Sequence, residues 1–171
     1  IYLHRAIEVT KTINDDEIRL NRLTNMGQKE SVEESPQHEK IKSLFEKIIE
    51  DGAHPNQVAS LEKLIRSVAD RGKEAILFSD VAVMFRKAGA EKISSRMLQN
   101  AIKESRIIRP LSKRAFVMCD IAMKTYASGC ESDAQDVLDL AIDAATNIRQ
   151  SSLRDEVFDE LGLAIKLMQE T

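Results

Sequence analysis

Few residues of this 171-residue chain belong to types that do chemistry, and their spacing builds no reactive site. Cys119 and Cys130 stand eleven positions apart, so they do not have the Cys-x-x-Cys spacing of a metal or redox site. We expect two reduced thiols, with a disulfide as the minor alternative. The three histidines share no metal-ligand spacing and are expected at the surface (His4, His38 and His54).

No motif for catalysis or nucleotide binding occurs either. The chain has no Gly-rich phosphate loop, no His-Glu-x-x-His zinc motif and no Gly-x-Ser-x-Gly nucleophile turn. A nucleophile or a general base needs partner side chains that orient it, and no such grouping is found. We therefore expect that the protein is not an enzyme and that it has no catalytic residue, no cofactor and no metal.

Three acidic residues recur at a regular interval, which makes them candidates for a functional role. Neighbouring acidic pairs are typical of solvated helix faces, but Asp80, Asp120 and Glu160 follow one another at intervals of forty residues. We interpret these three as structural groups. They would pair with basic residues of neighbouring units, such as Arg114 or Arg154.

The composition favours a folded, all-α chain. Apolar residues make up 43% and charged residues 31%, as in globular proteins, and only six Gly and three Pro are present to form turns. The 25 basic and 28 acidic residues give a net charge of −3, which predicts no nucleic-acid partner. Apolar runs reach only four or five residues, so we expect no membrane span. With no signal-peptide pattern and with reduced thiols, we expect a cytoplasmic protein.

Apolar residues recur with helical periodicity through most of the chain. Between Ala134 and Ile148, seven of them follow one another at steps of three and one, which predicts a single apolar stripe on an α-helix. Gly89 and Gly129 each precede a predicted helix, and we interpret Pro110 as closing one. The same reasoning predicts helices over 2–13, 15–26, 38–51, 55–71, 74–88, 91–108, 114–128 and 152–169.

The chain matches itself when it is shifted by forty residues. Residues 74–114 and 114–154 agree at more than a quarter of their positions, among them Gly89 with Gly129. Such agreement indicates an internal repeat. A hairpin of two amphipathic helices cannot cover both of its apolar faces alone, so stacked hairpins are expected to share a continuous core.

The repeat predicts one helical domain. We divide it into an irregular segment at 15–37, hairpins at about 38–73, 74–113 and 114–153, and a terminal helix at 154–169, all within a single domain over 1–171. Residues 28–39 are polar and are interpreted as an exposed linker or frayed loop, or else as a solvated helix extension. Apolar residues over 1–13 have the spacing of a second helix. The chain is therefore expected to begin with the second helix of a unit and to end with the first helix of another.

The order of residue sizes in the unit resembles that of a tetratricopeptide (TPR) repeat. In that family a large residue, a large–small pair, a turn glycine, a small residue and a small–aliphatic pair follow at fixed spacing. The same order is found in Met118, Ile121-Ala122, Gly129, Ala134, Leu138 and Ala141-Ile142. The resemblance covers about 38–169, with a repeat of about forty residues in place of thirty-four. It implies a right-handed stack of antiparallel helical hairpins whose first helices line a concave face.

The resemblance also implies where a partner would bind. If the first helices line a concave face, nine of their residues would point to it (Val83, Arg86, Lys87, Cys119, Met123, Tyr126, Asp159, Leu163 and Lys166). The basic members of this set, together with Lys124, would flank an apolar stripe. Such a surface suits an extended or helical peptide with acidic groups. We therefore expect a non-catalytic interaction scaffold. The alternative is that Met123, Tyr126 and Leu163 only pack against neighbouring helices.

Two other functions fit the same pattern. One is an oligomerisation or regulatory module, because the helix at 152–169 carries apolar residues on more than one stripe. At least one end of the array is then expected to be buried against another copy or against further repeats. The other is a helical-repeat RNA binder, which the acidic balance disfavours. The expected partner is a protein or a peptide, with a homo-oligomer as an alternative.

Overall fold

The computed structural model describes residues 36–170, and in this part of the chain the fold is all-α, as the sequence predicts. The helices are α3 (Pro36–Glu50), α4 (Pro55–Arg66), α5 (Arg71–Lys87), α6 (Glu91–Arg106), α7 (Leu111–Ala127), α8 (Glu131–Thr146) and α9 (Ser151–Glu170). No strand occurs among the described residues. The helices predicted over 2–13 and 15–26 lie outside the described residues, as does the irregular segment up to residue 35.

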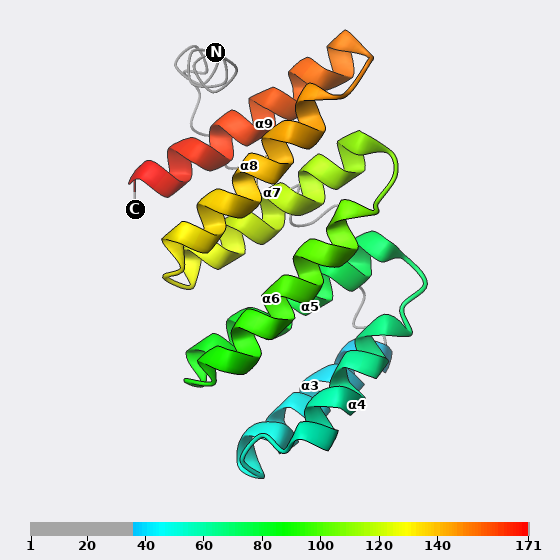
Figure 1. Cartoon of the computed structure of the whole chain (residues 1–171), viewed down its shortest axis with the longest axis vertical. Coiled ribbons are helices and arrows are strands. Elements are labelled where there is room, and N and C mark those ends of the chain that lie inside the picture. Colours follow the sequence, from blue (N-terminus) through cyan, green and yellow to red (C-terminus); the bar gives the residue numbers. More distant parts are fainter. Residues whose placement is uncertain (1–35, 171) are drawn as a thin grey trace.

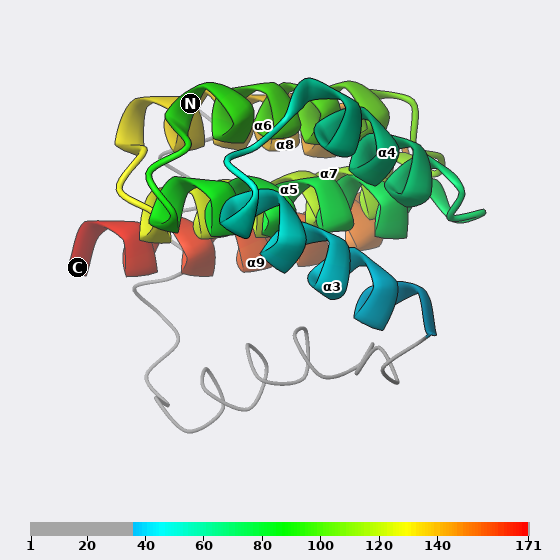
Figure 2. The same ribbon diagram turned by 90° about the horizontal axis from the view of Figure 1, so that it is seen from below.

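The helices pack as successive pairs. Helices α3 and α4, α5 and α6, and α7 and α8 contact each other within pairs, and α9 follows as a single helix (Figure 1). We call α3, α5, α7 and α9 the first helices and α4, α6 and α8 the second helices. Figure 2 shows the two kinds in separate layers. Helix α7 contacts both α5 and α9, so the pairs stack through their first helices, as in a helical-repeat fold.

Glycine residues make the tight turns within the pairs. Gly52, Gly89 and Gly129 have φ of +86°, +77° and +81°, a region that side-chain-bearing residues rarely adopt. The N–H of Gly89 donates to the carbonyl of Arg86 at 2.9 Å, and the N–H of Ala90 donates to that of Phe85 at 2.9 Å. These bonds satisfy the free carbonyls at the end of α5. The two glycines predicted to punctuate the repeat therefore do so for a conformational reason.

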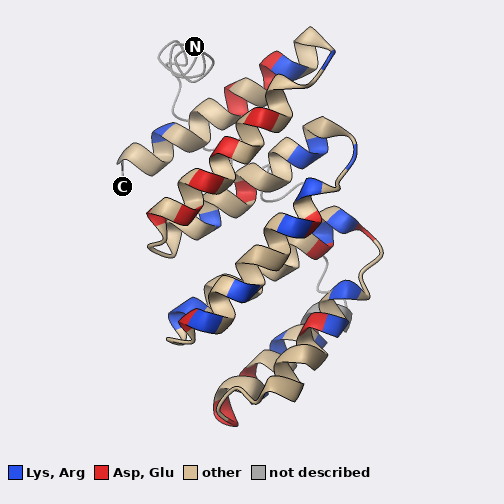
Figure 3. Cartoon of the chain, viewed as in Figure 1, with Lys and Arg blue, Asp and Glu red and all other residues tan. Residues whose placement is uncertain are grey.

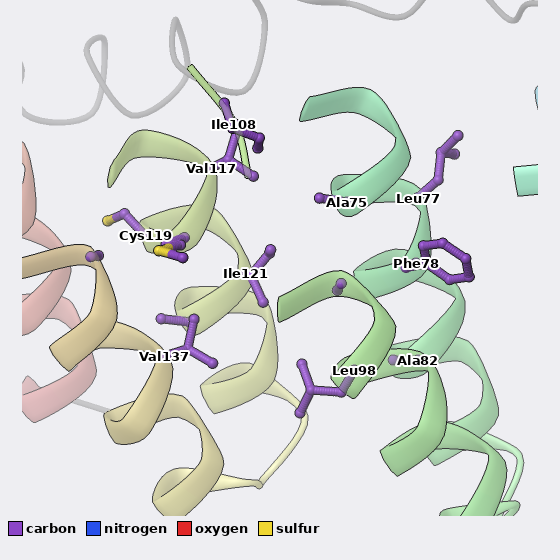
Figure 4. Packing of buried hydrophobic residues seen from close by; sticks show 14 of the residues in the cluster. Ala75, Leu77, Phe78, Ala82, Leu98, Ile108, Val117, Cys119, Ile121 and Val137 are labelled. Carbon is purple, nitrogen blue, oxygen red and sulfur yellow. The ribbon is translucent and has the colours of Figure 1, made fainter. Parts of the chain in front are cut away.

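The core lies between the two layers and is built from the predicted stripes. On α8, the stripe residues are buried or half-buried, and Ala141 is completely inaccessible to solvent. Phe78 and Met118, which are forty residues apart, are buried on successive first helices, α5 and α7 (Figure 4 labels Phe78). Each large side chain buried in this way contributes about 1.5–3 kcal/mol. The small residues between them allow the helices to approach closely.

Three helix boundaries differ clearly from the predicted ones, and the N-cap residues explain all three. Helix α4 ends at Arg66 instead of residue 71, and α5 begins at residue 71 instead of 74. The reason is Asp70, whose carboxylate accepts a hydrogen bond of 2.9 Å from the N–H of Lys73. An N-cap residue has an extended backbone, so helix α4 cannot continue through it. Helix α7 begins at residue 111 instead of 114, because Pro110 is its N-cap.

Residues 36–39 are the remaining correction. They belong to α3 and not to the linker or frayed loop that their polarity suggests. Proline fits the first helical turn because the N–H that it lacks has no partner there in any helix. The alternative, a helix extension at the start of the segment, lies outside the described residues.

Candidate functional site

The candidate partner-binding residues form rows across the layer of first helices. Val83, Met123 and Leu163 occupy one repeat position on α5, α7 and α9, and Arg86, Tyr126 and Lys166 occupy another. Because α7 packs against both α5 and α9, residues of one row lie on neighbouring helices. The remaining three candidates are Lys87, Cys119 and Asp159, of which Lys87 is exposed and Asp159 half-buried.

Two of the nine candidates are buried. Cys119 is 2% exposed and Leu163 is 3% exposed, so neither side chain is open to a ligand on the surface. Burial raises the pKa of the Cys119 thiol to about 12, and the nearby Asp120 and Glu160 carboxylates add to this effect. At neutral pH the thiol is therefore protonated, which makes it a poor nucleophile and a poor metal ligand.

The half-buried candidates lie toward the turns between paired helices. Val83 and Arg86 line a narrow space of about 10 Å³ where α5, α6, α7 and the start of α8 meet, together with Leu98, Thr125 and Cys130. We call this space the joint cleft. It is too small for a ligand, so Arg86 can meet a partner only where its side chain is exposed at the surface of the cleft.

Lys124 does not remain available for an acidic ligand. Its ammonium nitrogen lies 2.7 Å from a carboxylate oxygen of Asp80 on α5 and 2.9 Å from one of Asp120 on its own helix. Burial alone favours the neutral amine, but the Asp120 and Asp80 carboxylates outweigh it and raise the pKa of Lys124. The recurring aspartates are thus structural, as expected. The partner predicted for them is wrong, because they pair with Lys124 and not with Arg114 or Arg154.

A second charged cluster, which sequence reasoning missed, joins the first pair of helices to the next. Glu74 and Glu104 are 1% and 4% exposed. Arg66 lies 2.7 Å from Glu104 and 3.6 Å from Glu74, and Arg71 lies 3.0 Å from Glu74 and 2.9 Å from Glu104. Burial raises the pKa of Glu74, the Glu104 carboxylate raises it further, and the two arginines partly oppose the shift. All four groups are engaged with each other, which indicates a structural role.

An open concavity lies at the other end of the stack. It has a volume of about 350 Å³ and lies between α8 and the C-terminal halves of α7 and α9. Leu138, Ile165 and Met168 are among the apolar residues that line it, and Tyr126 and Gln135 are among the polar ones. We call it the end groove. It contains only one of the nine candidate residues, Tyr126.

Helices α6 and α8 differ in the charge that they carry (Figure 3). Helix α6 exposes four basic side chains (Lys92, Arg96, Lys103 and Arg106). Helix α8 contains five acidic residues and no lysine or arginine (Glu131, Asp133, Asp136, Asp139 and Asp143). The overall charge of −3 hides this separation, which is visible only when the residues are assigned to helices.

Two further kinds of site do not occur among the described residues. Between residues 36 and 170, no three His, Cys, Asp or Glu side chains are grouped so that they could hold a metal ion. Over the same residues, no helix combines the length and the apolar character that crossing a membrane requires. In comparisons with known proteins, no family model, no curated protein and no solved structure matches the chain.

Proposed function

We propose that this protein is a non-catalytic scaffold, a TPR-like α-solenoid in the cytoplasm that binds a peptide or protein along its layer of first helices. The observation that supports the proposal is the pair of rows across α5, α7 and α9. Helices that pack side by side present the same repeat positions next to one another, which makes an extended surface from short units.

The chemistry of this surface favours a partner with both apolar and acidic groups. Val83 and Met123 are half-buried and offer apolar area, and Tyr126 adds an aromatic ring with a polar end. Arg86 and Lys87 lie at the C-terminal end of α5 and provide positive charge. Lys124 is left out of the proposed contact because Asp80 and Asp120 already pair with it. Cys119 and Leu163 are left out because they are buried.

A site-specific photo-crosslinker tests the proposal. We would place it at Met123, in the middle of the rows, and as a matched control at Gln99, which is exposed on the outer side of α6. In an extract of the source organism, we expect a discrete crosslinked partner from position 123 and none from position 99. The double variant Arg86→Glu, Lys87→Glu should weaken this product at moderate salt while the far-UV circular dichroism spectrum stays unchanged.

Three results would contradict the proposal. The first is equal crosslinking from positions 99 and 123, and the second is a product that does not respond to the charge reversal. The third is a product made of two copies of the chain, which would favour the oligomerisation module instead. Mass spectrometry of the product distinguishes these cases.

A further inference from the structure

We infer that the turn between α6 and α7 is a docking site for a short acidic segment of a partner protein, one that carries a large apolar side chain beside its carboxylates. The site consists of Lys103, Arg106, Ile107 and Arg109, all of them exposed, and we call it the turn patch. It lies at the end of α5 and α6 that is remote from the turn joining these two helices. The inference therefore does not depend on the rows of first-helix residues.

Basic residues gather where two successive connections of the stack meet. Over residues 66–74 and 103–114 the chain has eight basic residues and three acidic ones, although its net charge is −3. Arg66 lies 2.7 Å from Glu104, and Lys113 lies 2.8 Å from Asp70, so the two connections lie side by side (Figure 3). The turn patch is therefore part of a strongly positive end of a chain that is acidic as a whole.

The carboxylates at this end do not neutralise the patch. All three already pair with other basic residues (Asp70, Glu74 and Glu104). The three charged members of the patch form no ion pair with a carboxylate of residues 36–170 (Lys103, Arg106 and Arg109). Burial lowers the pKa of the neighbouring Arg114, and the Arg109 guanidinium lowers it further, while Asp143 opposes both effects. Carboxylates of a ligand would therefore be attracted to the patch.

An apolar side chain stands among these charges. Ile107 is 58% exposed, more than any other large apolar residue that the structure describes. It follows Arg106 directly and stands four residues after Lys103, which places Ile107 and Lys103 on the same side of the helix end. The patch thus offers a ligand one apolar contact surrounded by positive charge.

The equivalent ends of the other second helices are polar. The C-cap residue is Ser67 on α4, Ile107 on α6 and Asn147 on α8. Ser67 Oγ donates to the carbonyl of Leu64 at 2.6 Å, and Asn147 Nδ2 donates to that of Asp143 at 2.8 Å. Such bonds satisfy carbonyls that have no partner at the end of a helix. Ile107 cannot make one with its side chain, and its exposed area contributes to stability only where another molecule covers it.

The chemistry of the patch favours a protein segment over a nucleic acid. Carboxylates match guanidinium and ammonium groups, and an aliphatic or aromatic side chain can cover Ile107. Nucleic-acid surfaces that bind single strands stack bases on aromatic rings, and the turn patch contains no aromatic residue. The occupant is therefore a short acidic segment with one large apolar side chain.

A labelled peptide, Asp-Glu-Leu-Asp-Glu with glycines at both ends, is the probe. The same peptide with glycine in place of leucine is its matched control. Binding to the full chain at low salt is followed by fluorescence anisotropy. We expect saturable binding of the leucine peptide and about three- to tenfold weaker binding of the glycine peptide, because only leucine covers Ile107. Added salt should weaken the binding of both peptides.

Variants of the chain locate the binding. Ile107→Asn gives α6 the C-cap residue type of α8, so we expect an unchanged circular dichroism spectrum, an undiminished Tm and equal affinity for the two peptides. Arg106→Gln together with Arg109→Gln should weaken the leucine peptide about tenfold or more. Lys42→Gln together with Lys92→Gln removes two exposed charges elsewhere and should weaken it less than about twofold.

Absence of saturable binding overturns the inference, as does an affinity for the leucine peptide that Ile107→Asn leaves unchanged. A lower Tm of this variant also overturns it, because Ile107 would then pack within the protein. An oligothymidylate that displaces the peptide and binds more tightly would replace the inferred partner by a nucleic acid. A dimer that the peptide dissociates would replace it by a second copy. The variants leave Arg86 and Met123 intact, so the proposed function is tested separately.

Discussion

The ammonium group of Lys124 on α7 lies 2.7 Å from the carboxylate of Asp80 on α5, and this ion pair joins two first helices of the stack. Asp120, which occupies the repeat position of Asp80, lies 2.9 Å from the same ammonium group. One cation therefore holds two carboxylates that recur with the repeat. Met84 and Ala164 occupy the position of Lys124 on α5 and α9, so the lysine itself does not recur at this position on these two described helices.

Replacing Lys124 tests how much this joint depends on the shared cation. Lys124→Met leaves two partly buried carboxylates without their cation, and we expect a loss of about 1–2 kcal/mol in the free energy of unfolding. Urea denaturation followed by circular dichroism measures it. Lys87→Met, at an exposed position of α5, is the matched control and should change the stability by less than about 0.5 kcal/mol. Adding Asp80→Asn to Lys124→Met should recover part of the loss, and equal stability of the two lysine variants would contradict the assignment.

The buried Glu74 makes a prediction about pH. Its pKa in the folded protein is raised above the ordinary value of 4.5, first by burial and then by Glu104. The folded state therefore holds the proton more tightly than the unfolded state, and stability falls as the pH rises from 4.5 through the folded pKa. Glu74→Gln removes this titration. We expect the variant to be at least as stable as the wild type at pH 7.

The difference between the Glu74→Gln variant and the wild type should shrink as the pH is lowered toward 4.5. Urea denaturation at a series of pH values measures it. Gln99→Ala, which removes no titratable group from an exposed position of α6, should differ from the wild type by the same amount at every pH and serves as control. A Glu74→Gln variant that is less stable than the wild type at pH 7 would mean that the two arginines outweigh the burial of Glu74.

The helices could be predicted from the sequence because burial follows periodicity. The stripe from Ala134 to Ile148 is read directly from the order of residues, and it packs in the core. The boundaries at Asp70 and Pro110 could not be obtained in that way, because a cap is recognised by its backbone conformation and its hydrogen bonds. Periodicity reports only the middle of a helix.

The candidate site could be predicted less well than the fold. The resemblance places Lys124 among the bases that face an acidic ligand, but this lysine stands four residues after Asp120 and pairs with it on one helix face. The cluster of Arg66 with Glu104 could not be foreseen, because its members come from different helices whose relative position only packing decides. The end groove is open because it lacks the wall that the start of α8 gives to the joint cleft. This difference is visible only when the two spaces are compared in three dimensions.

The two cysteines are expected to differ in reactivity. Cys119 is buried, and its pKa is raised to about 12, so almost no thiolate forms at pH 8. Cys130 is partly exposed at the start of α8. Iodoacetamide should therefore alkylate Cys130 in the folded protein at pH 8 and leave Cys119 unmodified. Mass spectrometry of the intact protein counts the added groups, and both cysteines should react in urea. Rapid alkylation of Cys119 without denaturant would contradict its burial.

The closest helix contacts are tested by Ala141→Glu. Ala141 is completely buried on α8, so a glutamate there would bring a charge and a long side chain into a place with no room and no partner. We expect a cost of about 3 kcal/mol or more, which lowers Tm by roughly 10 °C or prevents folding. Ala59→Glu is the matched control, because Ala59 is an alanine on the exposed side of α4 and the helix tolerates glutamate there. Thermal unfolding followed by circular dichroism compares the two. If both variants melt as the wild type does, Ala141 is exposed in solution, and the packing of α8 against its neighbours is different from the one described.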